Sequence, residues 1–240
     1  MSLVDVATMA SHVDMTMLKP NVGFAQGAEW IDENRDHGFA ALCISPFLVP
    51  VAAQRLFDST TRVCSVLAFP LGYALTEAKA DEAAHLVGLG CVEVDMVINI
   101  AALLEGEDAF VHHDIEAVVA SVHRASEGTA IVKVILETGY LATADIERGC
   151  RLAVQAGAHF VKTSTGFGPR GASLEDVRTM RAAVGPDIGV KAAGGIRDLD
   201  SVRAMLDAGA TRIGTSAGGE ILAELARRVG EEPGTSASGA

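Results

Sequence analysis

Charged side chains interrupt segments that otherwise read as buried β-strands. The segments are VEVDMVIN with Asp95, IVKVILE with Lys133 and Glu137, HFVKTST with Lys162, and IGVKAAGG with Lys191. Strands covered on both faces are usually continuous apolar runs, and an ionised group is rarely buried without a partner because it loses its hydration. These charges therefore indicate either a structural ion-pair cluster or a site that does chemistry.

Lys162 and Lys191 lie near the C-terminal ends of two successive predicted strands. A free lysine has a pKa of about 10.4 and is a poor nucleophile at neutral pH. A neighbouring ammonium and an apolar pocket both disfavour the charged form and bring the pKa of such a lysine to roughly 7–8. That lysine can attack a carbonyl and form a Schiff base, whose iminium withdraws electrons while the adjacent carbon loses a proton or a C–C bond. Asp95 is the candidate for moving protons there.

Two glycine-containing loops follow the last two predicted strands. They read AGGI at 193–196 and GTSAG at 214–218. Glycine lets backbone N–H groups approach an anion, and a helix N-terminus behind the loop favours negative charge. Turns need glycine for other reasons, so each loop alone is weak evidence, but together they predict a phosphate site.

The elements that position these residues follow a recurring alternation. Short apolar, β-rich runs are centred near Val13, Leu42, Val66, Asp95, Val134, Val161, Val190 and Ile213. Helical periodicity follows each run, at 28–37, 49–57, 76–89, 108–125, 144–156, 174–184, 199–208 and 220–229. The capping box that begins at Ser173 predicts a helix start, and Gly90, Gly128, Gly157 and Gly209 predict helix ends.

Eight strands alternating with eight helices predict an α/β fold with parallel strands and right-handed crossovers. We expect a single (β/α)₈ TIM barrel over residues 1–229, since about 250 residues is typical of that fold. An open doubly wound sheet is the alternative. Only a closed barrel brings the charges of the fourth to seventh strands together at one site. The small, polar segment 230–240 is expected to be a disordered tail.

Composition restricts the partners. Hydrophobic residues make up 49% of the chain and aromatic residues only 5%, which predicts a large aliphatic core. Nineteen basic residues against 31 acidic ones give a net charge of −12, which argues against nucleic acid or an anionic membrane as the partner. An anionic small substrate would need a locally positive pocket.

Cysteines and the N-terminus suggest the compartment. Cys43, Cys64, Cys91 and Cys150 are far apart with no C-x-x-C pair, which is typical of buried thiols in a reducing compartment rather than of a disulfide framework or a zinc site. The first residues lack the basic region of a signal peptide, and no run of 18 apolar residues occurs. We expect a cytoplasmic protein.

Several segments together resemble the deoxyribose-phosphate aldolase family. They run in family order from about residue 12 to residue 218: DMTMLKP (14–20), CISP (43–46), FPLG (69–72), EVDMVIN (93–99), KVILETG (133–139), FVKTSTGF (160–167) and VKAAGGIR (190–197). The sixth and seventh segments are the most specific. Many members have His where Met15 stands and serine where Ala193 stands, and the tail lacks the terminal tyrosine that some members carry.

The resemblance implies a class I aldolase of deoxyribonucleoside catabolism. Such an enzyme reversibly cleaves 2-deoxy-D-ribose 5-phosphate into D-glyceraldehyde 3-phosphate and acetaldehyde, without metal or organic cofactor, and a homodimer is expected. By resemblance, Lys162 forms the Schiff base, Lys191 holds the second ammonium, and Asp95 relays protons with a bound water. Resemblance also assigns Asp14 and Thr16 to the polar site, and Gly166, Gly194, Gly195, Gly214 and Ser216 to the phosphate.

Two other functions use the same residues. One is a Schiff-base aldolase for a different phosphorylated sugar, which would differ only in pocket shape. The other is a sugar-phosphate-binding barrel without catalysis, in which the buried charges are structural. The lysine pair distinguishes them, because a binding protein does not need a deprotonated lysine.

Overall fold

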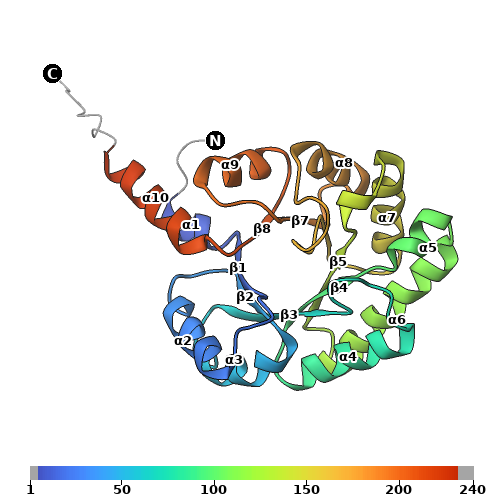
Figure 1. Ribbon diagram of the computed structural model, residues 1–240, viewed down its shortest axis with the longest axis horizontal. Coiled ribbons are helices and arrows are strands. Elements are labelled where there is room, and N and C mark those ends of the chain that lie inside the picture. The colour runs from blue at the N-terminus through green and yellow to red at the C-terminus, as the bar shows by residue number, and fades with distance from the viewer. Residues whose placement is uncertain (1–4, 232–240) are drawn as a thin grey trace.

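The computed structural model describes residues 5–231, which form a closed barrel of eight parallel strands (Figure 1). Each strand pairs with the next one in the sequence, and β8 pairs with β1 through Val13 opposite Ile213. This closure confirms the (β/α)₈ barrel and rules out the open doubly wound sheet. The strands are β1 Val13–Met17, β2 Ala41–Ile44, β3 Arg62–Leu67, β4 Glu93–Val97, β5 Ile131–Ile135, β6 Phe160–Lys162, β7 Gly189–Ala193 and β8 Arg212–Thr215.

Helices surround the barrel, one main helix after each strand (Figure 1). In order they are α2 Phe24–Asn34, α3 Val49–Arg55, α4 Thr76–Gly88, α6 Asp108–Ser126, α7 Thr143–Gln155, α8 Leu174–Val184, α9 Leu199–Asp207 and α10 Gly218–Glu231. Four short elements were not predicted: α1 Val6–Ala10, α5 Ile100–Glu105, and the 3₁₀ turns η1 Pro46–Leu48 and η2 Thr138–Tyr140. None of the helices within residues 5–231 is both long and apolar enough to cross a membrane.

Helix boundaries follow the local signals in most places. Ser173 Oγ accepts a hydrogen bond from the backbone N–H of Asp176 at 3.1 Å, which confirms the predicted start of α8. Gly90 and Gly209 have φ of 103° and 111°, a conformation that favours glycine, where α4 and α9 end. The bounds of the helix expected at 28–37 were wrong, because α2 runs from Phe24 to Asn34. The final helix, α10, extends to Glu231, so the tail predicted at 230–240 was wrong for its first two residues, and its remainder at 232–240 lies outside the described residues.

The barrel has an aliphatic outer layer and a polar interior. Between strands and helices lie fully buried side chains such as Val94, Met96, Val132 and Val134. Side chains alternate between the two faces of a strand, so the residues between these positions point into the barrel. The strand register then decides which interior side chains are neighbours: Asp95 is paired with Lys133, and Lys162 with Lys191.

Candidate active site

Seven charged side chains fill the barrel interior, and each is less than 10% exposed. They are Asp14, Glu93, Asp95, Lys133, Lys162, Lys191 and Arg212. Asp95 lies at the centre of this ion cluster. Its Oδ2 is 2.7 Å from Lys162 Nζ and 2.7 Å from Lys191 Nζ, and its Oδ1 is 2.9 Å from Lys133 Nζ. The predicted convergence of charges from the fourth to seventh strands is confirmed for Asp95, Lys133, Lys162 and Lys191, whereas Glu137 lies outside the cluster and bonds to Thr165.

Sequence reasoning missed two members of the ion cluster, Glu93 and Arg212. Glu93 lies 2.6 Å from Lys133 Nζ and 3.1 Å from Arg212, and Arg212 also donates to Asp14 at 2.6 Å. Both are charges inside predicted strands, so the rule that identified Asp95 would also have found them. The structural ion pairs considered as an alternative are therefore present, and every cation of the cluster takes part in at least one of them.

Charge balance distinguishes Lys162 from its neighbours. Within the cluster of Asp14, Glu93, Asp95, Lys133, Lys162, Lys191 and Arg212, three carboxylates face four cations. Lys133 contacts all three carboxylates, and Lys191 contacts two. Lys162 contacts only Asp95, which it shares with both of those lysines. Because a buried charge is stabilised mainly by its partners, Lys162 is the least compensated cation of the cluster.

The surrounding charges favour the ionised forms of Asp95 and Lys191. Burial alone would raise the pKa of Asp95, but the three surrounding lysine charges outweigh it and hold that pKa well below its usual range. Burial would lower the pKa of Lys191, but Asp14 and Asp95 outweigh it and raise the pKa above the ordinary lysine value. Asp95 and Lys191 are therefore an ionised pair beside Lys162. The apolar surroundings expected for Lys162 are therefore absent where its Nζ meets Asp95 and Lys191.

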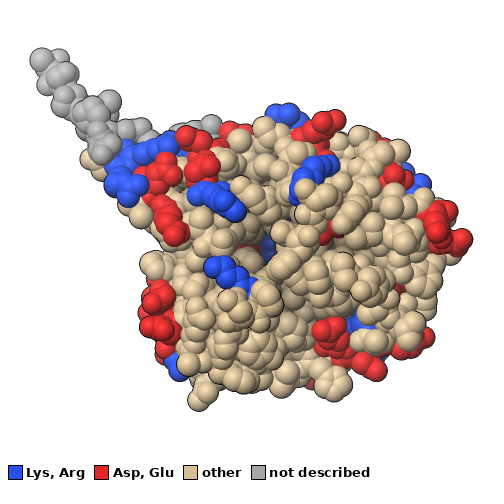
Figure 2. Space-filling model, in the orientation of Figure 1, with Lys and Arg blue, Asp and Glu red and all other residues tan. Residues whose placement is uncertain are grey.

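A pocket of about 440 Å³ opens above the ion cluster. Of the cluster's cations, Lys162 is the one that lines this pocket, and Lys19 and Arg197 line it as well. No aspartate or glutamate between residues 5 and 231 contributes to its wall. Figure 2 shows blue side chains at a hollow in the middle of one face, while most acidic side chains lie around the edge. In a chain of net charge −12, this is the locally positive pocket that an anionic substrate requires.

Glycines form part of the pocket wall, to which Trp30 and Gln26 also belong. Gly194 and Gly195 have φ of 89° and 81°, and Gly166 has φ of 88°. A Cβ on Gly194 would lie 2.9 Å from Gly171 Cα, so the loops after β6 and β7 can approach only without side chains. Backbone amides at the surface of such a loop can bind an anion.

The structure separates the predicted site residues into two layers. Six of them line the pocket together with Lys162: Thr16, Gly166, Gly194, Gly195, Gly214 and Ser216. Asp14, Asp95 and Lys191 lie beneath, fully or almost fully buried, and Asp95 connects to the pocket through Lys162. Gly214 also makes room for the lower layer, because a Cβ there would lie 3.1 Å from Lys191 Cε. Lys19 and Arg197 were not predicted as site residues.

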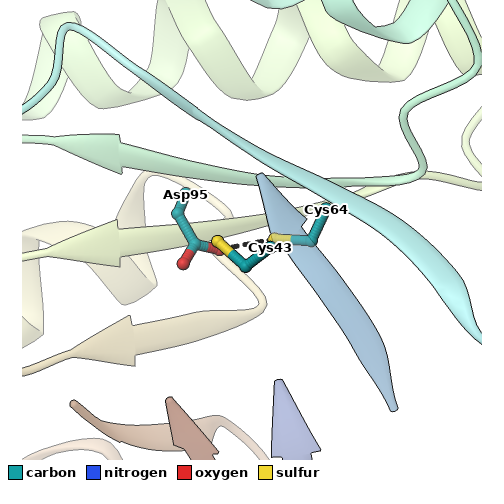
Figure 3. Close-up of side chains that lie close together, drawn as sticks. All are labelled: Cys43, Cys64 and Asp95. Carbon is teal, nitrogen blue, oxygen red and sulfur yellow. Dashed lines mark hydrogen bonds between the residues drawn. The ribbon is translucent and has the colours of Figure 1, made fainter. Parts of the chain in front are cut away.

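Two cysteines lie beside Asp95 inside the barrel (Figure 3). Cys43 and Cys64 are register partners on β2 and β3, and Cys64 Sγ donates to Asp95 Oδ1 at 3.4 Å. Their two sulfur atoms and an oxygen of Asp95 lie within 4.8 Å of one another. The trio does not fit a divalent cation well, because the oxygens of Asp95 already bind ammonium groups and the cluster has a cation in excess. All four cysteines are buried and free, as predicted.

Comparison with known proteins gives consistent results. A family model described as DeoC/LacD family aldolase matches residues 7–224. The chain is 51% identical over 215 residues to deoxyribose-phosphate aldolase 2 of Bacillus licheniformis, covering 90% of this chain and 95% of the relative. It is 49% identical over 215 residues to deoxyribose-phosphate aldolase of Bacillus subtilis, with coverage of 90% and 95%. A tetrameric deoxyribose phosphate aldolase structure from Aeropyrum pernix is 30% identical, with a TM-score of 0.84 and 92% of each chain covered.

Proposed function

The chain belongs to the DeoC/LacD family of aldolases, and we propose that it reversibly cleaves 2-deoxy-D-ribose 5-phosphate into D-glyceraldehyde 3-phosphate and acetaldehyde. The position of Lys162 supports this proposal most strongly. Lys162 is the least compensated cation of the ion cluster, and it lies in the wall of a pocket with two further cations and no carboxylate among the described residues. That arrangement combines an amine nucleophile with a site for an anionic sugar.

Lys162 Nζ attacks the C1 aldehyde of the open-chain sugar in this proposal, and loss of water gives an iminium. The C3 hydroxyl then loses its proton, the C2–C3 bond breaks, and its electron pair moves into the enamine. Protonation of C2 and hydrolysis release acetaldehyde and restore the amine. The iminium occupies the place of the Lys162 ammonium, so Asp95 at 2.7 Å stabilises its charge.

Asp95 and Lys191 have distinct roles in this mechanism. Asp95 stays ionised, because the lysines around it hold its pKa well below the usual range. It orients both amines through the same oxygen and positions the water that relays protons to and from the substrate. The Lys191 ammonium, held by Asp14 and Asp95, is the second positive charge beside the Lys162 nitrogen and stays outside the covalent chemistry.

The substrate phosphate binds in this proposal at the loops that follow β6, β7 and β8. We assign it to the backbone and side-chain groups of Gly166, Gly194, Gly195, Gly214 and Ser216. Lys19 and Arg197 add positive charge in the same pocket, which favours the phosphorylated sugar over the free sugar. Thr16 lines the pocket near the ion cluster, and its hydroxyl donates to the backbone oxygen of Asp14 at 2.9 Å.

Reductive trapping tests the proposal. The protein is incubated with acetaldehyde and borohydride, and the adduct is mapped by mass spectrometry. We expect a reduced two-carbon adduct on Lys162. The absence of an adduct, or an adduct confined to Lys133 or Lys191, would contradict the Schiff-base assignment. Cytoplasmic location and a homodimer stay predictions; the Aeropyrum pernix aldolase is described as tetrameric.

A further inference from the structure

Glu137 is a buried carboxylate that the proposed mechanism does not use. It follows β5 directly, is 2% exposed and has a left-handed backbone with φ of 58° and ψ of 60°. No ion pair between described residues includes Glu137, and it is not part of the pocket wall. A buried carboxylate that has no cation beside it needs other hydrogen-bond donors. A residue with a Cβ keeps a left-handed backbone only where the surrounding structure holds it there.

Thr165 supplies those donors. Its backbone N–H lies 3.3 Å and 3.2 Å from the two carboxylate oxygens of Glu137, and its hydroxyl also donates to Oε2. The backbone on either side of Glu137 is fixed to the end of β6. Leu136 N donates to the oxygen of Lys162 at 3.0 Å, and Thr138 N donates to the oxygen of Thr163 at 2.9 Å.

These contacts determine the shape of the loop that follows Lys162. Thr165 Oγ1, held by Glu137, accepts a hydrogen bond from Phe167 N at 3.0 Å, so the chain turns at Gly166, whose φ is 88°. Gly168 packs directly against Glu137, since a Cβ on Gly168 would lie 2.8 Å from Glu137 Cδ. Glu137 therefore contacts both ends of the segment 165–168, of which Thr165, Gly166 and Phe167 line the pocket.

We propose that Glu137 is a positioning residue that holds the segment 165–168 in the conformation that binds the substrate phosphate. This inference rests on the proposed function. Glu137 touches the loop proposed to bind the phosphate and makes no ion pair with Lys162 or Lys191. Its loss should weaken recognition of the phosphate and leave Schiff-base formation intact.

The experiment compares two substrates, 2-deoxy-D-ribose 5-phosphate and 2-deoxy-D-ribose, and measures kcat and KM for each. In Glu137→Ala we expect the ratio of the two kcat/KM values to fall by about 10- to 100-fold, mostly through a higher KM for the phosphate ester. Glu137→Gln keeps one carbonyl acceptor and should recover part of the ratio. Acetaldehyde trapping on Lys162 should proceed at the wild-type rate in both variants.

Two further variants separate positioning from general stability. Thr165→Val removes the hydroxyl but keeps the branched shape, and should lower the same ratio even if Glu137→Ala does not fold. Asp114→Asn is the matched control: Asp114 is as buried as Glu137, but its partner is Lys79 at 2.6 Å, outside the pocket. It should lower the melting temperature without moving the ratio.

The positioning role would be overturned if the wild-type enzyme works normally and Glu137→Ala and Thr165→Val leave the ratio of the two kcat/KM values unchanged. Equal losses of kcat/KM on both substrates leave that ratio unchanged and would have the same meaning. Wild-type protein that neither traps acetaldehyde nor cleaves the phosphate ester would refute the proposed function, and the inference with it. The wild-type control therefore distinguishes the two failures.

Discussion

Lys162 and Lys191 donate to the same oxygen atom, Oδ2 of Asp95, at 2.7 Å each. The two ammonium positions are thus held close together by one carboxylate, although like charges repel. Lys191 has a second carboxylate partner in Asp14, at 2.5 Å, and Lys162 has none. The pair is therefore asymmetric, which makes Lys162 the amine and Lys191 the permanent cation in the proposed mechanism.

Replacing Lys162 by arginine tests that asymmetry. Arginine keeps the positive charge near Asp95 but stays protonated and cannot form a Schiff base. We expect Lys162→Arg to fold and to retain less than about 0.1% of wild-type cleavage. Aldol cleavage rate and melting temperature are measured together, with Lys79→Arg, at another buried ion pair, as the control that keeps turnover. Substantial cleavage by Lys162→Arg would show that the mechanism is wrong.

Replacing Asp95 by asparagine tests the stability of the ion cluster. The substitution removes a fully buried negative charge and leaves three lysines with fewer partners. Removing one partner of a buried ion pair costs about 3–5 kcal/mol of unfolding free energy, which urea denaturation measures. Asp200→Asn breaks an exposed pair with Arg228 and should barely change the midpoint. Equal effects of the two variants would contradict the central role of Asp95.

Lys19 and Arg197 provide the test of the positive pocket. Both line it, and neither contacts the ion cluster at salt-bridge distance. We expect Lys19→Gln and Arg197→Gln each to raise KM for the phosphate ester by about 10-fold with little change in kcat, because a charged hydrogen bond to the phosphate is lost. Arg178→Gln, on the exposed face of α8, is the control. A fall in kcat without a change in KM would contradict the assignment.

His159 predicts how stability depends on pH. Burial, and then the nearby His123, lower the pKa of His159 below its usual value, and its Nδ1 accepts the N–H of Val132 at 3.1 Å. Below about pH 6.5 the unfolded chain binds a proton that the folded state resists, so stability falls as the pH drops from 7 to 5. His159→Asn keeps an acceptor and should flatten this slope. The change in the urea midpoint between pH 7 and pH 5 measures this slope, and His85→Asn, at an exposed histidine, is the control. An unchanged slope in His159→Asn would refute the prediction.

Metal removal should leave the activity unchanged. The proposed chemistry uses the Lys162 amine, and the oxygens of Asp95 beside Cys43 and Cys64 already bind ammonium groups. We therefore expect dialysis against a chelator to preserve kcat and KM. Loss of activity that returns on adding a divalent metal would identify a metal-dependent aldolase instead.

The sequence by itself determined the fold and pointed to the charged residues on which the proposed mechanism depends. Buried parallel strands are apolar runs of recognisable period, so the eight strands were located correctly and the charges within them were conspicuous. Asp95, Lys162 and Lys191 were identified for that reason. The start of α2 was misplaced, because Phe24 follows a glycine that caps the helix without a side-chain signal.

Only the tertiary structure decided how those charges are paired and which of them reaches substrate. Strand register and barrel closure bring Glu93 and Arg212 to the same cluster as Asp95 and Lys133, and no local pattern encodes a contact between residues that far apart in the chain. The backbone of Glu137 is left-handed because tertiary contacts hold it there, against the local preference of a residue with a Cβ. Loop packing, finally, leaves Lys162 as the cation of that cluster that lines the pocket.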